Sequence, residues 1–202
     1  MSTNLNITIL LLAAGNSSRL MKDKLALEFR GMTLLERSIA SAADSLAKEI
    51  IVVTGPKKEL KTSVEDRKGI RLVHNPDWQQ GIGTSIKAGL RDLMDHKELP
   101  SAVIIAVCDQ PYISAGHFDR LIGRYRRTGK KIIASAYAGS YGTPVLYDRQ
   151  LFEELLSIPD TEGAKRQILD HTSAEEMEWV HFPGGEIDID TPEDLNKIKQ
   201  GT

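Results

Sequence analysis

The stretch ITILLLAAGNSSRLMKDK, residues 7–24, predicts both the fold class and a candidate site. Residues 7–12, five of which are apolar, run into a small-residue turn, which is typical of a buried strand in a parallel sheet. Gly15 allows a sharp turn or a close approach of the backbone to a ligand. Backbone N–H groups in such a turn can face an anion, and the cations Arg19 and Lys24 follow closely. The stretch therefore indicates a site for polyphosphate.

Two known phosphate-binding motifs are excluded by this stretch, and one ordinary interpretation stays open. It lacks the Gly-Lys-Ser/Thr ending of a P-loop, and Gly15 is its only glycine where the dinucleotide fingerprint needs three. A buried strand that ends in a glycine turn and is followed by solvated Arg and Lys side chains would have the same sequence. This stretch alone does not separate that interpretation from a phosphate site.

The totals for the chain limit the classes of function. A length of 202 residues with 41% hydrophobic residues predicts one domain, residues 1–202, with a sizeable core. A net charge of −2 gives no electrostatic argument for nucleic acid or membrane as a partner. The single Cys108 excludes an intrachain disulfide and a cysteine-rich metal site. The first apolar run is too short to span a membrane and follows no basic segment, so we expect a cytoplasmic protein.

Apolar runs alternate with helical patterns along the chain, which predicts an α/β protein with parallel strand pairs and right-handed crossovers. Thr33 and Glu36 are spaced as a capping box for the first helix. Residues 138–144, which are rich in small side chains, are expected to form a loop. The expected strands are 7–12, 50–53, 70–73, 102–107, 131–137, 144–147 and 178–182. The expected helices are 34–46, 57–68, 86–94, 117–127, 148–156, 166–169 and one that begins at Pro192.

Two acidic residues stand where apolar runs end. Asp109 closely follows residues 102–107, the position at which open α/β sheets bind ligands, and a carboxylate suits Mg²⁺. The ordinary alternative is that Asp109 caps the next helix. Asp190 stands just before Thr191, a helix start, and could complete a Mg²⁺ site with Asp109. We interpret Cys108 as a buried spacer and not as a nucleophile.

An ordered loop is expected before the helix at residues 86–94. It contains three turn-forming residues and Trp78. Ser85 would lie near the first turn of the helix, where its hydroxyl could cap the helix or contact a ligand. Both roles stay open for Ser85.

Four separated stretches resemble one family in the same order. They are LAAGNSSRLMKDKLAL (12–27), NPDWQQGIGTSIKAGL (75–90), CDQP (108–111) and DIDTPEDL (188–195), and the segments YGTPVLYD (141–148) and EGAKRQIL (162–169) extend the match over nearly the whole chain. The chain resembles the MobA-like nucleotidyltransferases, and within them the molybdenum cofactor cytidylyltransferases. The resemblance implies a three-layer α/β/α sandwich around a mostly parallel, doubly wound, Rossmann-like sheet.

The chemistry implied by the resemblance is a Mg²⁺-dependent transfer. The phosphate of a molybdopterin-type acceptor would attack the α-phosphorus of a nucleoside triphosphate, and pyrophosphate would leave. Ala14 favours CTP over GTP, because guanylyltransferases of this family tend to carry Gly at this position. Arg19 and Lys24 would neutralise charge in the transition state, and Asp109 with Asp190 would hold Mg²⁺. A molybdoenzyme client is implied as a possible partner.

The candidate residues carried over from the family fall into three groups. The catalytic candidates are Arg19, Lys24 and Asp109. Nucleotide binding is expected from Leu12, Ala13, Ala14, Gly15, Asn16, Ser17, Ser18, Arg19, Lys24, Asn75, Gly81, Ser85 and Asp109. Acceptor binding is expected from Gln110, Gly142, Thr143, Pro144, Lys165 and Asp188, where Asp188 is also the alternative to Asp190 as the second metal ligand.

The chain departs from the family pattern at two places. Leu20-Met21 replaces the family's Met-Gly, which removes backbone freedom beside the expected triphosphate. Residues 160–165 read DTEGAK where the family has G-D-x-G-A-R, so Lys165 supplies a point charge without the bidentate fork of Arg. The open alternatives are the same chemistry with GTP or with a sugar or polyol phosphate, and a non-catalytic nucleotide or cofactor carrier for molybdoenzyme maturation.

Overall fold

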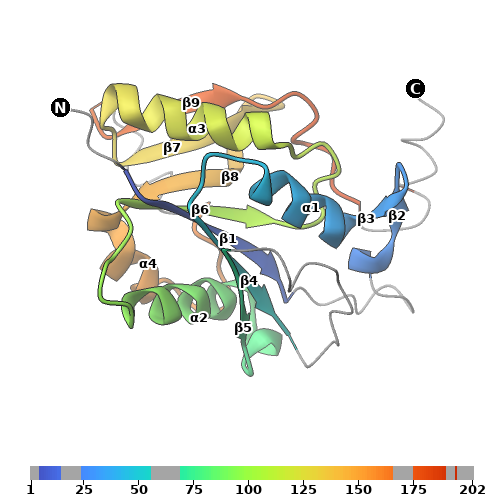
Figure 1. The fold of residues 1–202 in the computed structure, drawn as a ribbon, viewed down its shortest axis with the longest axis horizontal. Helices are drawn as coiled ribbons and strands as arrows, with labels where there is room; N and C mark the ends of the chain where they lie inside the picture. Colours follow the sequence, from blue (N-terminus) through green and yellow to red (C-terminus); the bar gives the residue numbers. More distant parts are fainter. Residues whose placement is uncertain (1–4, 15–23, 56–68, 166–174, 190–193, 195–202) are drawn as a thin grey trace.

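The computed structural model describes residues 5–14, 24–55, 69–165, 175–189 and 194. A seven-stranded sheet with the strand order β5-β4-β1-β6-β8-β7-β9 runs through the molecule (Figure 1). Its first four strands are mutually parallel and contain β1 between β4 and β6. They are β1 (Ile7–Ala13), β4 (Glu49–Thr54), β5 (Ile70–His74) and β6 (Ala102–Val107).

The other part of the sheet contains the strand expected at 144–147, but this strand begins earlier and is antiparallel, which the sequence did not indicate. β8 (Ser140–Asp148) is antiparallel to both β6 and β7 (Ile132–Tyr137), and β9 (Met177–His181) is parallel to β7. The loop expected at residues 138–144 is therefore wrong beyond its first two residues. Ala138 and Gly139 form the turn with φ angles of 48° and 72°, and Ser140 begins the strand. Small residues occur inside β8 because the Tyr137 ring lies against Gly142, a close approach that a side chain would block.

Helices cover both faces of the sheet (Figure 1). α1 (Leu34–Ala43) and α3 (Ala115–Thr128) lie on one face, and α2 (Ile82–Met94) and α4 (Phe152–Ser157) lie on the other. Along β1, Ile9 and Leu11 pack in the first core while Leu10 and Leu12 pack in the second. Both faces of β1 are buried, which explains its continuous apolar run. The doubly wound, three-layer α/β/α architecture is confirmed.

Local signals for helix starts were largely correct. Glu36 N–H donates to Thr33 Oγ1 (3.1 Å) and Thr33 N–H donates to Glu36 Oε2 (2.9 Å), which confirms the capping box of α1. These hydrogen bonds from Thr33 hold the pKa of the Glu36 carboxyl below its usual value. α1 ends at Ala43, three residues before the expected end, and α2 begins at Ile82, four residues before the expected start.

Short elements complete the described chain. η1 (Lys24–Ala26) leads into the small hairpin of β2 (Glu28–Phe29) and β3 (Met32–Thr33), and η2 (Trp78–Gln80) precedes α2. The helix expected at residues 148–156 is instead η3 (Arg149–Leu151) followed by α4. The helices expected at 57–68, at 166–169 and from Pro192 lie outside the described residues.

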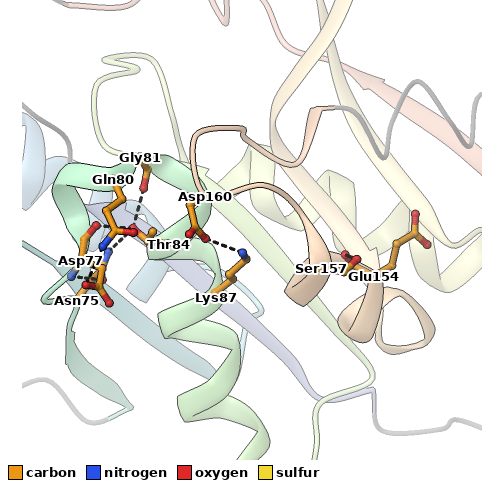
Figure 2. A network of polar contacts seen from close by, with 9 residues as sticks. All are labelled: Asn75, Asp77, Gln80, Gly81, Thr84, Lys87, Glu154, Ser157 and Asp160. Carbon is orange, nitrogen blue, oxygen red and sulfur yellow. Dashed lines mark hydrogen bonds and ion pairs between the residues drawn. The ribbon is translucent and has the colours of Figure 1, made fainter.

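The start of α2 packs tightly against the segment that follows α4. Gly83 N–H donates to the carbonyl oxygen of Asp160 (2.9 Å), and Lys87 Nζ forms an ion pair with Asp160 Oδ1 (2.6 Å; Figure 2). A Cβ atom on Gly83 would overlap the carbonyl of Pro159 and would lie 2.9 Å from the carbonyl oxygens of Asp160 and Glu162. The glycine at this position therefore allows α2 to begin where it does.

We predict that Gly83→Ala lowers the free energy of unfolding by about 1–3 kcal/mol, because backbone atoms cannot move away from the new methyl group cheaply. Gly116→Ala is the matched control, since Gly116 is also the second residue of its helix and a Cβ there has its nearest neighbour at 3.8 Å. It should stabilise the protein by up to about 1 kcal/mol. Urea unfolding of the three proteins measures both effects. Equal stabilities for the two variants would show that the start of α2 can move away from residues 159–162 at little cost, which would contradict the prediction.

Candidate functional site

The centre of the candidate site is an ion pair between residues from distant parts of the chain. Lys24 Nζ lies 2.7 Å from Asp109 Oδ2, and the two side chains are only 19% and 21% exposed. Asp109 follows β6 at the carboxyl end of the parallel strands, as the sequence predicted. The alternative role of Asp109 as a helix cap is excluded, because Ser114 caps α3 and accepts a hydrogen bond from His117 N–H.

The second carboxylate oxygen of Asp109 is left without a hydrogen bond. Asp109 Oδ1 is buried and has no hydrogen-bond partner within the described part of the chain. Leaving a buried polar atom unpaired costs about 1–3 kcal/mol, more for a charged group. Such an atom in a native fold calls for an explanation, of which a bound ion is one.

Residues 185–189, where the C-terminal acidic motif begins, lie along the residues that follow β6. Ile189 N–H donates to the carbonyl oxygen of Asp109 (3.0 Å), and Gln110 Nε2 donates to the carbonyl oxygen of Gly185 (2.8 Å). Ile189 is fully buried in a small third core with Phe29. Asp188 is exposed beside it, and Asp190 is outside the described residues.

A small cluster of rings and cations supports both partners of the ion pair. Phe29 contacts Tyr112 edge-to-face, with 5.7 Å between ring centroids, and Arg37 lies over the Phe29 ring at 5.2 Å. Arg37 Nε also donates to the carbonyl oxygen of Pro111 (2.6 Å). The cluster therefore joins the hairpin after Lys24 to the turn that contains Asp109.

Two adjoining cavities meet at Asp109. We name them the Trp78 cavity, with a volume of about 300 Å³, and the Tyr137 cavity, with about 470 Å³. Leu12, Ile82, Val107 and Asp109 belong to the walls of both. A ligand in one cavity and a ligand in the other would both reach the Asp109 carboxylate.

The loop before α2, which contributes Trp78, Gln79 and Gly81 to the Trp78 cavity, is held by a polar network (Figure 2). Asn75 is 2% exposed and donates from Nδ2 to Thr84 Oγ1 (2.8 Å), and its Oδ1 accepts from Asp77 N–H. Nδ2 also donates to Ser85 Oγ (3.0 Å). Thr84 Oγ1 in turn donates to the carbonyl oxygen of Gly81 (2.7 Å). Asn75 therefore supports the loop, and Ser85 caps no backbone group of α2, which begins from Gly81.

One wall of the Tyr137 cavity is fixed by close packing. A Cβ on Gly142 would overlap the Tyr137 hydroxyl, and a Cβ on Gly185 would lie 2.5 Å from Cδ1 of the same ring. Phe182 contacts Tyr137 edge-to-face, with 6.1 Å between centroids. Burial raises the pKa of the Tyr137 hydroxyl, so it is protonated at neutral pH.

Behind this wall lies a buried histidine network. His117 stacks on Phe182 at 4.2 Å between centroids, and its Nε2 lies 2.7 Å from Ser135 Oγ, which donates to the carbonyl oxygen of Pro144 (2.6 Å). Since that hydroxyl hydrogen is used, His117 must donate from Nε2. Burial, with the Arg120 charge nearby, lowers the pKa of His117 to about 3. His117 is thus a neutral structural group.

The predicted site residues fall into three sets. Leu12, Ala14, Lys24, Gly81, Ser85 and Asp109 line the Trp78 cavity, and Gln110, Gly142, Thr143, Lys165 and Asp188 line the Tyr137 cavity. Ala13, Asn75 and Pro144 are described but belong to neither wall. Gly15, Asn16, Ser17, Ser18, Arg19 and Asp190 lie outside the described residues, so their roles stay predictions.

Several wall residues were not among the candidates. Trp78 lines the first cavity next to Gly55, and Tyr137, Tyr141 and Glu186 line the second. An aromatic residue inside a loop of turn-forming residues was the available signal for Trp78. The two tyrosines flank the β7–β8 turn, and their convergence could not be predicted without the hairpin.

The residues at the Asp109 end of the sheet fit a metal held by few protein ligands. Among the described residues no group of three or more His, Cys, Asp or Glu side chains could hold a metal ion. Mg²⁺ is typically held by one or two carboxylates, with substrate phosphates and waters completing its octahedral shell. The unpaired Asp109 Oδ1 supplies one such oxygen.

Residues 9–176 match the family described as MobA-like NTP transferase domain. The chain belongs to this family. It is therefore a nucleotidyltransferase-family protein. In the part of the chain that the structure describes, no helix is long and apolar enough to span a membrane.

Relatives of similar length carry different names. The chain is 30% identical over 200 residues to a molybdenum cofactor cytidylyltransferase of Escherichia coli (strain K12), covering 96% of each protein. It is 27% identical to a nicotine blue oxidoreductase of Paenarthrobacter nicotinovorans, covering 96% of this chain and 94% of that one. A manganese complex of a Mycobacterium tuberculosis H37Rv protein has a TM-score of 0.71 at 20% identity, covering 98% of this chain and 100% of that chain. The last likeness concerns the fold alone.

We predict that Cys108 does not act as a nucleophile. It is 2% exposed, and burial together with the neighbouring Asp109 charge raises the pKa of its thiol to about 12. Because only the thiolate reacts, alkylation by iodoacetamide at pH 8 should be at least about 100-fold slower in the native protein than in guanidinium chloride. Mass spectrometry of the single cysteine measures both rates. Equal rates would show a reactive thiol in the site.

Proposed function

We propose that this protein is an enzyme that transfers CMP from CTP to the phosphate of a molybdopterin-type cofactor and releases pyrophosphate. The observation that carries the proposal is the place of Asp109, which belongs to both cavities, pairs with Lys24 through one oxygen and keeps the other unpaired. A transfer between two substrates needs such a group at the point where they meet. Membership of the family and the 30% identical cytidylyltransferase support the nucleotide and the acceptor.

The Trp78 cavity would take the nucleotide. Ala14, the last described residue before the predicted phosphate turn, lines this cavity together with Lys24 and Ser85. The triphosphate would lie along residues 15–19, with Arg19 and Lys24 neutralising its charge. Ala14 favours CTP over GTP on the resemblance.

The Tyr137 cavity would take the acceptor. Lys165 lies in its wall and supplies a cation for the acceptor phosphate. A phosphate is already ionised at neutral pH, so it needs no general base to attack the α-phosphorus. The walls of the two cavities contain no described histidine, and the thiol of Cys108 is protonated. These features favour direct transfer over a covalent enzyme intermediate.

Asp109 would hold Mg²⁺ together with Asp190 or Asp188. The bound ion would act as a Lewis acid on the phosphate oxygens. Asp188 lines the Tyr137 cavity, and the backbone of Ile189 between the two acids is tied to Asp109. This tie supports a metal site made by distant parts of the chain. The transfer would occur in the cytoplasm, where a molybdoenzyme client could receive the product.

A second candidate is the same chemistry on another phosphorylated acceptor, such as a sugar or polyol phosphate. Lys165 in place of the family's Arg favours this second candidate. Lys binds a phosphate as a point charge, without the bidentate geometry of Arg, and so selects less strictly among phosphorylated acceptors. Relatives at similar identity carry different names, which also favours a second class of acceptor.

Pyrophosphate release tests the proposal. CTP, GTP, ATP and UTP are each incubated with Mg²⁺ and with molybdopterin, glycerol 3-phosphate or ribose 5-phosphate. We expect release that depends on both CTP and molybdopterin. Release with a sugar or polyol phosphate alone would establish the second candidate, and tight CTP binding without release from any mixture would establish a carrier.

We predict that Asp109→Asn lowers kcat by at least about 100-fold while the protein keeps its fold, because the change removes the charge that faces both substrates and the metal. Asp95→Asn is the control, since Asp95 is exposed at the far end of α2. It should retain the wild-type rate and melting temperature. Steady-state kinetics and thermal unfolding provide the comparison. A rate near that of the wild type in Asp109→Asn would remove Asp109 from the chemistry.

A further inference from the structure

A second unpaired oxygen lies next to Asp109, in the side chain of Gln110. Gln110 is 2% exposed and forms part of the wall of the Tyr137 cavity. Its Nε2 donates to the carbonyl oxygen of Gly185 (2.8 Å), in a fully buried hydrogen bond. A carbonyl oxygen can only accept, so this bond fixes which end of the amide is the nitrogen.

The amide oxygen of Gln110 is therefore the group that remains for a ligand. Oε1 is buried and has no hydrogen-bond partner in the part of the chain that the structure describes. An unmade hydrogen bond of this kind costs about 1–3 kcal/mol. A hydrogen bond from a bound donor would offset that cost, and the role of Gln110 would then be recognition.

The cavity that Gln110 lines also has flat aromatic surfaces. The Tyr137 ring is held in place by Gly142, Gly185 and Phe182, and Tyr141 belongs to the same wall. Aromatic rings of this kind stack well on planar ligands. A fixed acceptor and a fixed ring in the wall of one cavity suit a planar group that carries a donor at its edge.

We propose that Gln110 is a specificity-determining residue, whose side-chain carbonyl accepts a hydrogen bond from an N–H group of a flat nitrogen heterocycle in the acceptor substrate. The inference rests on the proposed assignment of the Tyr137 cavity to the acceptor. A hydroxyl rotates to donate or accept, so a polyol would gain little selectivity from Gln110. An N–H group at a ring edge is a donor in one direction only, and a site built to receive it rejects an analogue that lacks it.

Two planar probes of similar size test this. Pterin carries N–H donors on its pyrimidine ring, and 1,3-dimethyllumazine has carbonyl groups and N-methyl groups there instead. Fluorescence titration without nucleotide measures the affinity of each for the wild-type protein, for Gln110→Met and for Gln150→Met. Gln150 is exposed after β8, which makes it a matched control.

We expect the wild type and Gln150→Met to prefer pterin by at least about 10-fold, the size of one unmade hydrogen bond. Gln110→Met should reduce that preference at least about 5-fold and leave the affinity for 1,3-dimethyllumazine nearly unchanged. If Gln110 had a merely structural role, Gln110→Met would weaken the binding of both probes equally and keep the ratio of their affinities. An unchanged ratio, no pterin binding by the wild type, or tighter binding of glycerol 3-phosphate than of pterin would overturn the proposal.

Thermal unfolding shows whether Gln110→Met is folded. If it is not, Gln110→Leu replaces it, because that variant also lacks the acceptor oxygen and should lose the preference for pterin; a preference for pterin kept by a folded Gln110→Leu would contradict the proposal. The outcome is separate from that of the proposed transfer. Pterin preference without pyrophosphate release from any mixture would overturn the transferase function alone, and CTP-dependent release without pterin preference would overturn the role of Gln110 alone.

Discussion

The ion pair between Lys24 and Asp109 is the interaction on which the rest of the candidate site depends. It joins the chain after the predicted phosphate turn to the end of the central strand β6, 85 residues later. The third core, in which Phe29 packs with Ile189, holds both segments in place, so a small apolar contact sets the geometry of a charged site.

Two consecutive residues after β6 keep a buried oxygen unpaired, and both belong to the walls of the cavities. Neither cavity is lined by the other described residues with a buried side-chain atom that lacks a hydrogen bond, which are Asn6, Arg71, Asp92 and Arg124. Asp109 Oδ1 could bind a cation, and Gln110 Oε1 could accept a hydrogen bond from a ligand. The segment around Gly185 and Ile189 fixes the other polar groups of both residues. The protein leaves these two buried oxygens without a hydrogen bond where two ligands would meet, as expected for a functional site.

Much of the fold could be predicted from the sequence, because its strongest signals are local. The apolar run of β1 and the capping box of Thr33 needed no tertiary information. The extension of β8 over residues 140–143 was missed because the reason for Gly142 is the ring of Tyr137, which only the folded sheet brings near. Asn75 was expected in the wall of the nucleotide pocket, but it lines neither cavity and instead bonds the loop before α2. The position of Asp109 was predictable from topology, whereas its unpaired oxygen was not.

The most direct test measures whether the unpaired Asp109 oxygen helps to bind a divalent ion together with a nucleotide. Electron paramagnetic resonance of free Mn²⁺ is recorded during titration with a non-hydrolysable CTP analogue, for the wild type and for Asp109→Asn. The account predicts that the wild type removes Mn²⁺ from solution in the presence of the analogue. It also predicts that Asp109→Asn leaves free Mn²⁺ close to the level set by the analogue alone. Equal Mn²⁺ binding by both proteins would contradict the central place given to Asp109.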